Sequence, residues 1–156
     1  MFTSKTIFKS SSQIKNSVLK LRLYTTNSNN NIKIPMAPTE YTFEKISKLI
    51  AHPHPGQVLV DVREPSELKN SGTIPGSLNI PYKSAPGSLN LPENEFKDLY
   101  SFDKPSKTNE LIFYCAAGLR AKAAAELAQS FGYNKIGVYP GSMNEWLAKS
   151  GKIEKV

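Results

Sequence analysis

The sequence has very little cysteine: Cys115 is the only one among its 156 residues. An internal disulfide framework and a metal site built only from cysteines are therefore excluded. No second cysteine could displace a sulfur atom bound at Cys115, so such a sulfur must leave to an acceptor outside the chain. The two histidines, His52 and His54, have no third ligand nearby, and we interpret them as part of a surface turn. The sequence thus predicts no metal and no cofactor.

Long hydrophobic runs are also absent. No stretch approaches the length of about 18–20 apolar residues that a helix needs to cross a bilayer, so no membrane span is predicted. The net charge of +7 would suit a nucleic-acid or membrane partner, but residues 1–39 hold six basic residues and no acidic one. The remaining residues hold 14 basic and 13 acidic side chains. Because the charge is confined to the N-terminal segment, we expect no nucleic-acid partner for the single folded domain.

The acid-free N-terminal segment has the composition of a targeting signal. It is basic and rich in Ser, Thr and Asn, and hydrophobic residues recur at helical spacing at Ile7, Ile14, Val18 and Leu21. These properties are typical of a mitochondrial presequence, whereas a secretory signal needs a continuous apolar core of about 7–15 residues. The alternative is a basic tail without a targeting function.

A boundary for this presequence is indicated by the stretch 22–25 (RLYT), which resembles a matrix-peptidase site with cleavage after Tyr24. We therefore predict a presequence over residues 1–24, recognised by the mitochondrial import machinery and directing the protein to the mitochondrial matrix. Residues 25–39 are predicted to form a disordered linker. The folded domain is predicted to span residues 40–152.

Beyond the linker, short apolar runs alternate with amphipathic stretches. The pattern predicts helices over residues 43–50, 64–68, 93–100, 119–131 and 142–149, and strands over residues 58–60, 78–80, 110–115 and 136–139. We expect Ser142 to cap the last helix with its side chain. Alternating strands and helices predict an α/β fold, in which helices cover both faces of a parallel sheet. Ligands of such sheets bind beyond the carboxyl ends of the strands, where Asp61 and Cys115 are expected to lie.

Cys115 lies between the predicted strand 110–115 and the alanine-rich helix that follows. In a strand-to-helix turn the backbone N–H groups of residues 116–120 can surround the sulfur, which would lower the thiol pKa and favour the nucleophilic thiolate. Gly118 lets the loop curl toward the sulfur without a Cβ atom in the way. The alternative is an inert buried cysteine, but the neighbouring glycine and arginine favour a reactive one.

Four blocks of the sequence carry a family resemblance. They are residues 60–67 (VDVREPSE), 72–81 (GTIPGSLNIP), 113–121 (FYCAAGLRA) and 139–146 (YPGSMNEW). In this order they resemble the single-domain rhodaneses, which are thiosulfate sulfurtransferases, and with the presequence the chain resembles the mitochondrial type. The resemblance implies a five-stranded parallel sheet with helices on both faces. It also implies a transfer in two steps: a thiolate takes sulfur from thiosulfate or a persulfide, and a thiol or cyanide removes it.

The resemblance and the loop chemistry together assign roles to individual residues. Cys115 is the predicted catalytic residue and would carry the persulfide. The predicted substrate-binding residues are Ala116, Ala117, Gly118, Leu119 and Arg120. Arg120 is placed to attract the divalent donor, and Lys122 is a candidate for a second cation. Asp61 and Arg63 are expected to support the loop from below through ion pairs or turn hydrogen bonds.

Four functions are alternatives to sulfur transfer. Phosphatases and arsenate reductases of the same fold have a Cys-x5-Arg loop, whereas Cys115 and Arg120 form the shorter Cys-x4-Arg spacing. The shorter loop closes around one sulfur atom and leaves no room for a tetrahedral oxyanion, which disfavours these two enzyme classes. A binding module without turnover and a dedicated persulfide carrier both remain open.

Overall fold

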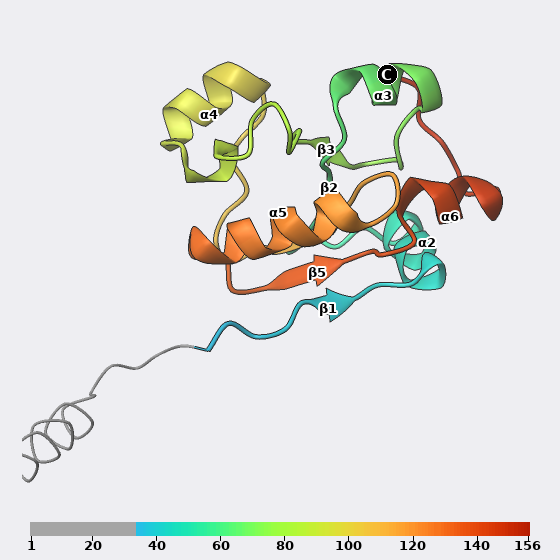
Figure 1. Ribbon diagram of the computed structural model, residues 1–156, viewed down its shortest axis with the longest axis horizontal. Helices are drawn as coiled ribbons and strands as arrows, with labels where there is room; N and C mark the ends of the chain where they lie inside the picture. The colour runs from blue at the N-terminus through green and yellow to red at the C-terminus, as the bar shows by residue number, and fades with distance from the viewer. Residues whose placement is uncertain (1–33) are drawn as a thin grey trace, which may run out of the picture. The chain divides into compact units, whose positions relative to one another are not determined.

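The computed structural model of the protein describes residues 34–156, and residues 35–156 form one compact unit (Figure 1). The predicted presequence and residues 25–33 of the predicted linker lie outside the described residues. The elements, in chain order, are β1 (Thr39–Glu40), α2 (Phe43–Ala51), β2 (Gln57–Asp61), α3 (Pro65–Ser71), β3 (Leu78–Asn79), the 3-10 helix η1 (Ser88–Asn90), α4 (Glu93–Tyr100), β4 (Glu110–Tyr114), α5 (Leu119–Ser130), β5 (Ile136–Val138) and α6 (Ser142–Ala148). Among the described helices, none has the length and apolar character needed to cross a membrane.

The sheet has five parallel strands in the order β1-β5-β4-β2-β3, which confirms the predicted α/β fold. The central strands β2 and β4 pair along their full length, from Gln57 opposite Glu110 to Asp61 opposite Tyr114. The N–H of Val62 then donates to the carbonyl of Tyr114 at 3.0 Å. Because the two strands end at the same level, the segments that follow Asp61 and Tyr114 leave the sheet side by side.

The two faces of the sheet are covered by different helices. Strand β4 shows the alternation, because Leu111 and Phe113 point into a cluster with the alanines of α5 and Phe96 of α4, whereas Ile112 points into a cluster with residues of α2 and α6. Cys115 continues the alternation of Leu111 and Phe113 and packs in the same cluster as the alanines of α5. The fold therefore buries the cysteine between the end of the sheet and α5.

Helix α5 packs closely on the sheet because its buried face consists of small side chains. Ala121, Ala124, Ala125 and Ala128 are all buried on that face. The helix ends at Ser130 and is followed by a glycine with a φ of 92°, close to the end predicted from the sequence. An alanine face of this kind brings the first turn of α5 close to the end of β4, where the cysteine lies.

One strand of the sheet is absent from the sequence prediction. Strand β1 contains only Thr39 and Glu40, which pair with Gly137 and Val138 of β5 at the edge of the sheet (Figure 1). Both residues of β1 are exposed and polar, so no apolar pattern marks them as a strand. The sheet therefore begins at Thr39, one residue inside the segment predicted as linker.

Candidate active site

Cys115 directly follows β4 and is 1% exposed. Its Sγ accepts a hydrogen bond from the N–H of Gly118 at 3.0 Å. Gly118 has a φ of 98°, and a Cβ atom at this position would lie 2.6 Å from the carbonyl oxygen of Pro140. Both the conformation and the close approach require glycine here, so the loop can fold back on the sulfur only with this residue.

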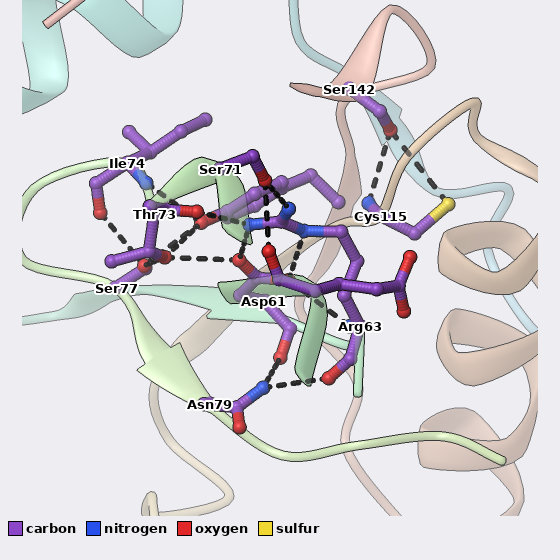
Figure 2. Close-up of polar contacts among 12 residues, drawn as sticks. Asp61, Arg63, Ser71, Thr73, Ile74, Ser77, Asn79, Cys115 and Ser142 are labelled. Atoms are coloured by element: carbon purple, nitrogen blue, oxygen red, sulfur yellow. Dashed lines mark hydrogen bonds and ion pairs between the residues drawn. The ribbon is translucent and has the colours of Figure 1, made fainter. Parts of the chain in front are cut away.

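The prediction for Ser142 is wrong. Gly141 is the N-cap residue of α6 and no side-chain cap is formed, while Ser142 is fully buried with a φ of 53°. Its Oγ accepts the N–H of Cys115 at 3.1 Å, donates to the carbonyl of Tyr139 at 2.9 Å and lies 3.9 Å from Sγ (Figure 2). The side chain is turned toward the cysteine instead of the helix end, so Ser142 fixes the backbone that carries the sulfur.

The backbone of α6 holds the same loop. The N–H of Met143 donates to the carbonyl of Cys115 at 2.9 Å, and that of Asn144 donates to the carbonyl of Ala116 at 3.0 Å. The first N–H groups of a helix have no partner inside the helix, and here two of them bind loop carbonyls. The loop carbonyls thereby point toward α6, which leaves the N–H of Gly118 free to point at the sulfur.

Arg120, on the first turn of α5, forms a bidentate ion pair with Glu67 of α3. Nη1 lies 2.7 Å from Oε2, and Nη2 lies 2.8 Å from Oε1. Oε2 also accepts the N–H of Glu64 at 2.9 Å. Hydrogen bonding to Arg120 lowers the pKa of Glu67 to about 2, and the same hydrogen bonding raises the pKa of Arg120, with a smaller contribution from the charge of Cys115. Arg120 therefore lies within electrostatic reach of the sulfur, but with its charge already paired.

Asp61 and Arg63 form the expected ion pair beneath the loop. Their side chains are 0% and 3% exposed, and Arg63 Nη2 lies 2.7 Å from Asp61 Oδ2 (Figure 2). Arg63 also donates to Ser71 Oγ at 2.8 Å and to the carbonyl of Gly72 at 2.7 Å. Asp61 Oδ2 accepts a further bond from Thr73 Oγ1 at 2.9 Å. All these groups are occupied by one another, so the pair holds α3 and the following turn on the end of β2.

Tyr114, which precedes the cysteine, is a second buried support that the sequence did not indicate. Its hydroxyl lies 2.8 Å from Thr73 Oγ1 and 2.9 Å from Ser77 Oγ, and it accepts the N–H of Ile74 at 3.1 Å. Burial raises the pKa of Tyr114 above its ordinary value. From the sequence, a tyrosine in an apolar strand is indistinguishable from an ordinary core residue. The partners of its hydroxyl lie in a turn that is distant in the chain.

The outer side of the loop carries little charge. Ala117 and Leu119 are exposed, Leu119 to 83%, and Ala116 is half-buried. Lys122 is exposed on the first turn of α5, where its N–H donates to the carbonyl of Gly118 at 3.1 Å. Within residues 34–156 the Lys122 ammonium has no ion-pair partner. The structure therefore brings the predicted loop residues and Arg120 around Cys115. Lys122 lies one helical turn after Gly118.

Comparisons with known proteins identify the family and agree with the fold. The model of the Rhodanese-like domain family matches residues 42–149. The chain is 53% identical to the protein named thiosulfate sulfurtransferase RDL2, mitochondrial, of Saccharomyces cerevisiae, covering 74% of this chain and 76% of that one. It is 44% identical to the thiosulfate:glutathione sulfurtransferase of the same yeast, covering 71% and 79%. The crystal structure of yeast RDL2, described as a single-domain sulfurtransferase, superposes with a TM-score of 0.72 over 74% of this chain and 94% of that one.

Proposed function

Because the chain belongs to the rhodanese-like domain family and is a sulfurtransferase of that family, we propose that it transfers sulfane sulfur from thiosulfate to a thiol or cyanide. The sulfur is carried as a persulfide on Cys115. The observation that carries the proposal is the hydrogen bond of 3.0 Å from the Gly118 N–H to Cys115 Sγ. A backbone donor aimed at the sulfur stabilises negative charge on it, and Cys115 is an anion both as the thiolate and as the persulfide of the proposed reaction.

In the first step, the Cys115 thiolate attacks the outer sulfur of thiosulfate. A bond forms between Sγ and that sulfur, the bond from the outer sulfur to the sulfonate sulfur breaks, and its electron pair leaves with sulfite. The cysteine becomes a persulfide anion, and no proton has to be removed. The small side chains of Ala116 and Ala117 leave room for the transferred sulfur, and the N–H groups of the loop can stabilise its charge.

In the second step, a thiolate or cyanide attacks the outer sulfur of the persulfide. The bond to Sγ breaks and its electron pair returns to Cys115 as the thiolate, while the acceptor leaves as a persulfide or as thiocyanate. The chain has a single cysteine, so the acceptor must come from outside it.

The remaining residues of the site have supporting roles in this proposal. The backbone of residues 116–120 binds the donor and the persulfide. Arg120 supplies a positive charge that interacts with the charge of Cys115, and Lys122 supplies a second positive charge to an approaching anion. Asp61 and Arg63 support the loop without contacting the substrate, because their polar atoms are already bonded to each other and to the turn beside them.

The protein acts in the mitochondrion, in line with the name of its 53% identical relative. We propose the matrix as the compartment, with residues 1–24 as a presequence, residues 25–39 as a linker and residues 40–152 as the catalytic domain. The acid-free composition of the first 39 residues supports this division.

Mass spectrometry of the protein after incubation with thiosulfate tests the proposal. We expect Cys115 to gain the mass of one sulfur atom, and addition of cyanide should remove it and give thiocyanate. The Cys115→Ser variant should gain nothing. Absence of the mass gain in the wild-type protein would contradict the proposal, and loading without continuous sulfite release in the presence of acceptor would favour a persulfide carrier.

The role of Arg120 has a separate test. In the Arg120→Ala variant we expect KM for thiosulfate to rise more than kcat falls, because a cation beside the loop is lost and its partner Glu67 keeps its negative charge, while the sulfur and its N–H donor remain. Steady-state sulfite release at varied thiosulfate concentrations measures both constants. An unchanged KM would contradict a role for Arg120 in binding the donor.

A further inference from the structure

Arg120, whose charge interacts with that of Cys115, is paired with a carboxylate. Glu67 binds the Arg120 guanidinium through both oxygens, at 2.7 and 2.8 Å. Glu64 is a second carboxylate that influences Arg120, and its Oε1 accepts the N–H groups of Lys83 and Ser84 at 3.0 and 3.3 Å. These contacts hold Glu64 against the loop after β3, and the ion pair holds the negative charge of Glu67 at Arg120.

The Arg120–Glu67 pair has no net charge at neutral pH. Its side chains are 18% and 34% exposed, so water screens the pair only in part. The other side chains at the outer side of the loop, Ala116, Ala117 and Leu119, are uncharged. An anion that approaches Cys115 therefore meets a neutral pair, whose field falls off faster with distance than the field of a free guanidinium.

We propose that Glu67 is a positioning residue that sets the charge preference for the sulfur donor. By neutralising Arg120, Glu67 reduces the advantage of a doubly charged donor such as thiosulfate over a singly charged one such as an organic persulfide or a thiosulfonate. The electrostatic energy of a donor in the field of Arg120 scales with the donor's charge, so loss of the carboxylate would favour the doubly charged donor more. This inference rests on the proposed sulfur transfer through Cys115.

A purely structural role for Glu67 predicts something different. Glu67 holds Arg120 on the first turn of α5, which directly follows the loop that carries Cys115 and Gly118, so a displaced loop would slow the reaction with every donor by a similar factor. The ratio of kcat/KM for two donors of different charge does not change in that case. This ratio therefore separates control of charge from support of the loop.

The test compares thiosulfate, which has two negative charges, with methanethiosulfonate, which has one and transfers its outer sulfur with methanesulfinate as the leaving group. We expect the Glu67→Gln substitution to raise the ratio of kcat/KM for thiosulfate to that for methanethiosulfonate by about fivefold, mainly through a lower KM for thiosulfate. The amide can still accept a hydrogen bond from Arg120 but no longer cancels its charge.

Two variants serve as controls. Glu67→Asp keeps the charge with a shorter side chain, so we expect the ratio to stay near that of the wild type even if both rates fall. Glu126→Gln removes the same charge from an exposed position on α5 and should leave the ratio unchanged. An unchanged ratio in Glu67→Gln, or an equal rise in either control, would overturn the inference.

A measurement that keeps Glu67 applies even if Glu67→Gln does not fold. The Lys122→Gln variant lacks the unpaired cation of the proposed site and retains the neutral Arg120–Glu67 pair, so raising the salt concentration should lower its kcat/KM for thiosulfate only slightly more than that for methanethiosulfonate. A much steeper fall for thiosulfate in this variant would show that the charge of Arg120 is not balanced and would overturn the inference. Absence of transfer from both donors in the wild type would instead contradict the proposed function.

Discussion

Two arginine–carboxylate pairs lie at the carboxyl edge of the same sheet, and they differ in their exposure to water. Asp61 and Arg63 are 0% and 3% exposed and have further hydrogen bonds to α3 and the turn after it. Glu67 and Arg120 are 34% and 18% exposed and lie beside the active loop. A charge buried without its partner is costly, whereas a partly exposed one can be solvated. The buried pair, Asp61 and Arg63, therefore only supports the fold. The partly exposed pair, Glu67 and Arg120, can lose one of its charges without unfolding the protein.

The largest effect expected from this comparison is on stability. Arg63→Met leaves the Asp61 carboxylate buried without a cation, and we expect the free energy of unfolding to fall by about 3–5 kcal/mol. Arg120→Met is the matched control and should cost about 1 kcal/mol, because Glu67 can be solvated. Urea unfolding of both variants measures the difference. Equal losses would contradict the assignment of the two pairs to different roles.

The buried side of the comparison also includes Tyr114. Tyr114→Phe removes a hydroxyl that contacts Thr73, Ser77 and the N–H of Ile74, and we expect a loss of about 1–3 kcal/mol, since these buried groups lose a partner. Tyr133→Phe is the control, because the Tyr133 hydroxyl makes one bond, to the carbonyl of Pro105 at 2.9 Å. The Tyr114 variant should unfold at the lower urea concentration, and the reverse order would contradict its role as a buried support.

Ser142 connects the buried scaffold to the reacting sulfur. Ser142→Ala leaves the buried N–H of Cys115 without an acceptor, and we expect sulfur transfer to slow by about tenfold. Ser142→Gly lacks the same hydroxyl but tolerates the φ of 53°, so it should transfer sulfur at the rate of the alanine variant and be more stable by about 1 kcal/mol. A glycine variant with wild-type transfer rate would contradict the role of the hydroxyl.

Features with a local signature were predicted from the sequence. Helix α4 (Glu93–Tyr100) has the predicted bounds, because the spacing of its apolar residues marks it within the segment itself. Cys115 was found in the same way, because the strand, the glycine and the helix that define its loop adjoin it in the chain. Local patterns therefore predict most of the elements and the position of Cys115 after β4.

Features that depend on contacts between distant segments were missed. Strand β1 exists only through its pairing with β5, and the hydroxyl of Ser142 serves Cys115, which is 27 residues away, although a serine at that position has the signature of a cap. The partner of Arg120 is Glu67, 53 residues away, and α3 contains no signal that points to the active loop. The sequence predicts a cation at the site, but only the fold reveals that a carboxylate neutralises it.

The smallest expected effect is the pH dependence of the exposed pair. The folded-state pKa of Glu67 is lowered from 4.5 to about 2, so the pair's contribution to stability is fully present above about pH 4.5 and is lost as the pH falls toward 2. Glu67→Gln has no such titration. The difference in the free energy of unfolding between wild type and Glu67→Gln should thus be constant between pH 7 and 5, at about 1 kcal/mol or less, and should shrink between pH 4.5 and 2. Urea unfolding at pH 7, 4 and 3 measures it. A difference that does not change with pH would mean that the carboxylate has no electrostatic contact with Arg120 in solution, so the pair could neither stabilise the fold nor balance the charge beside Cys115.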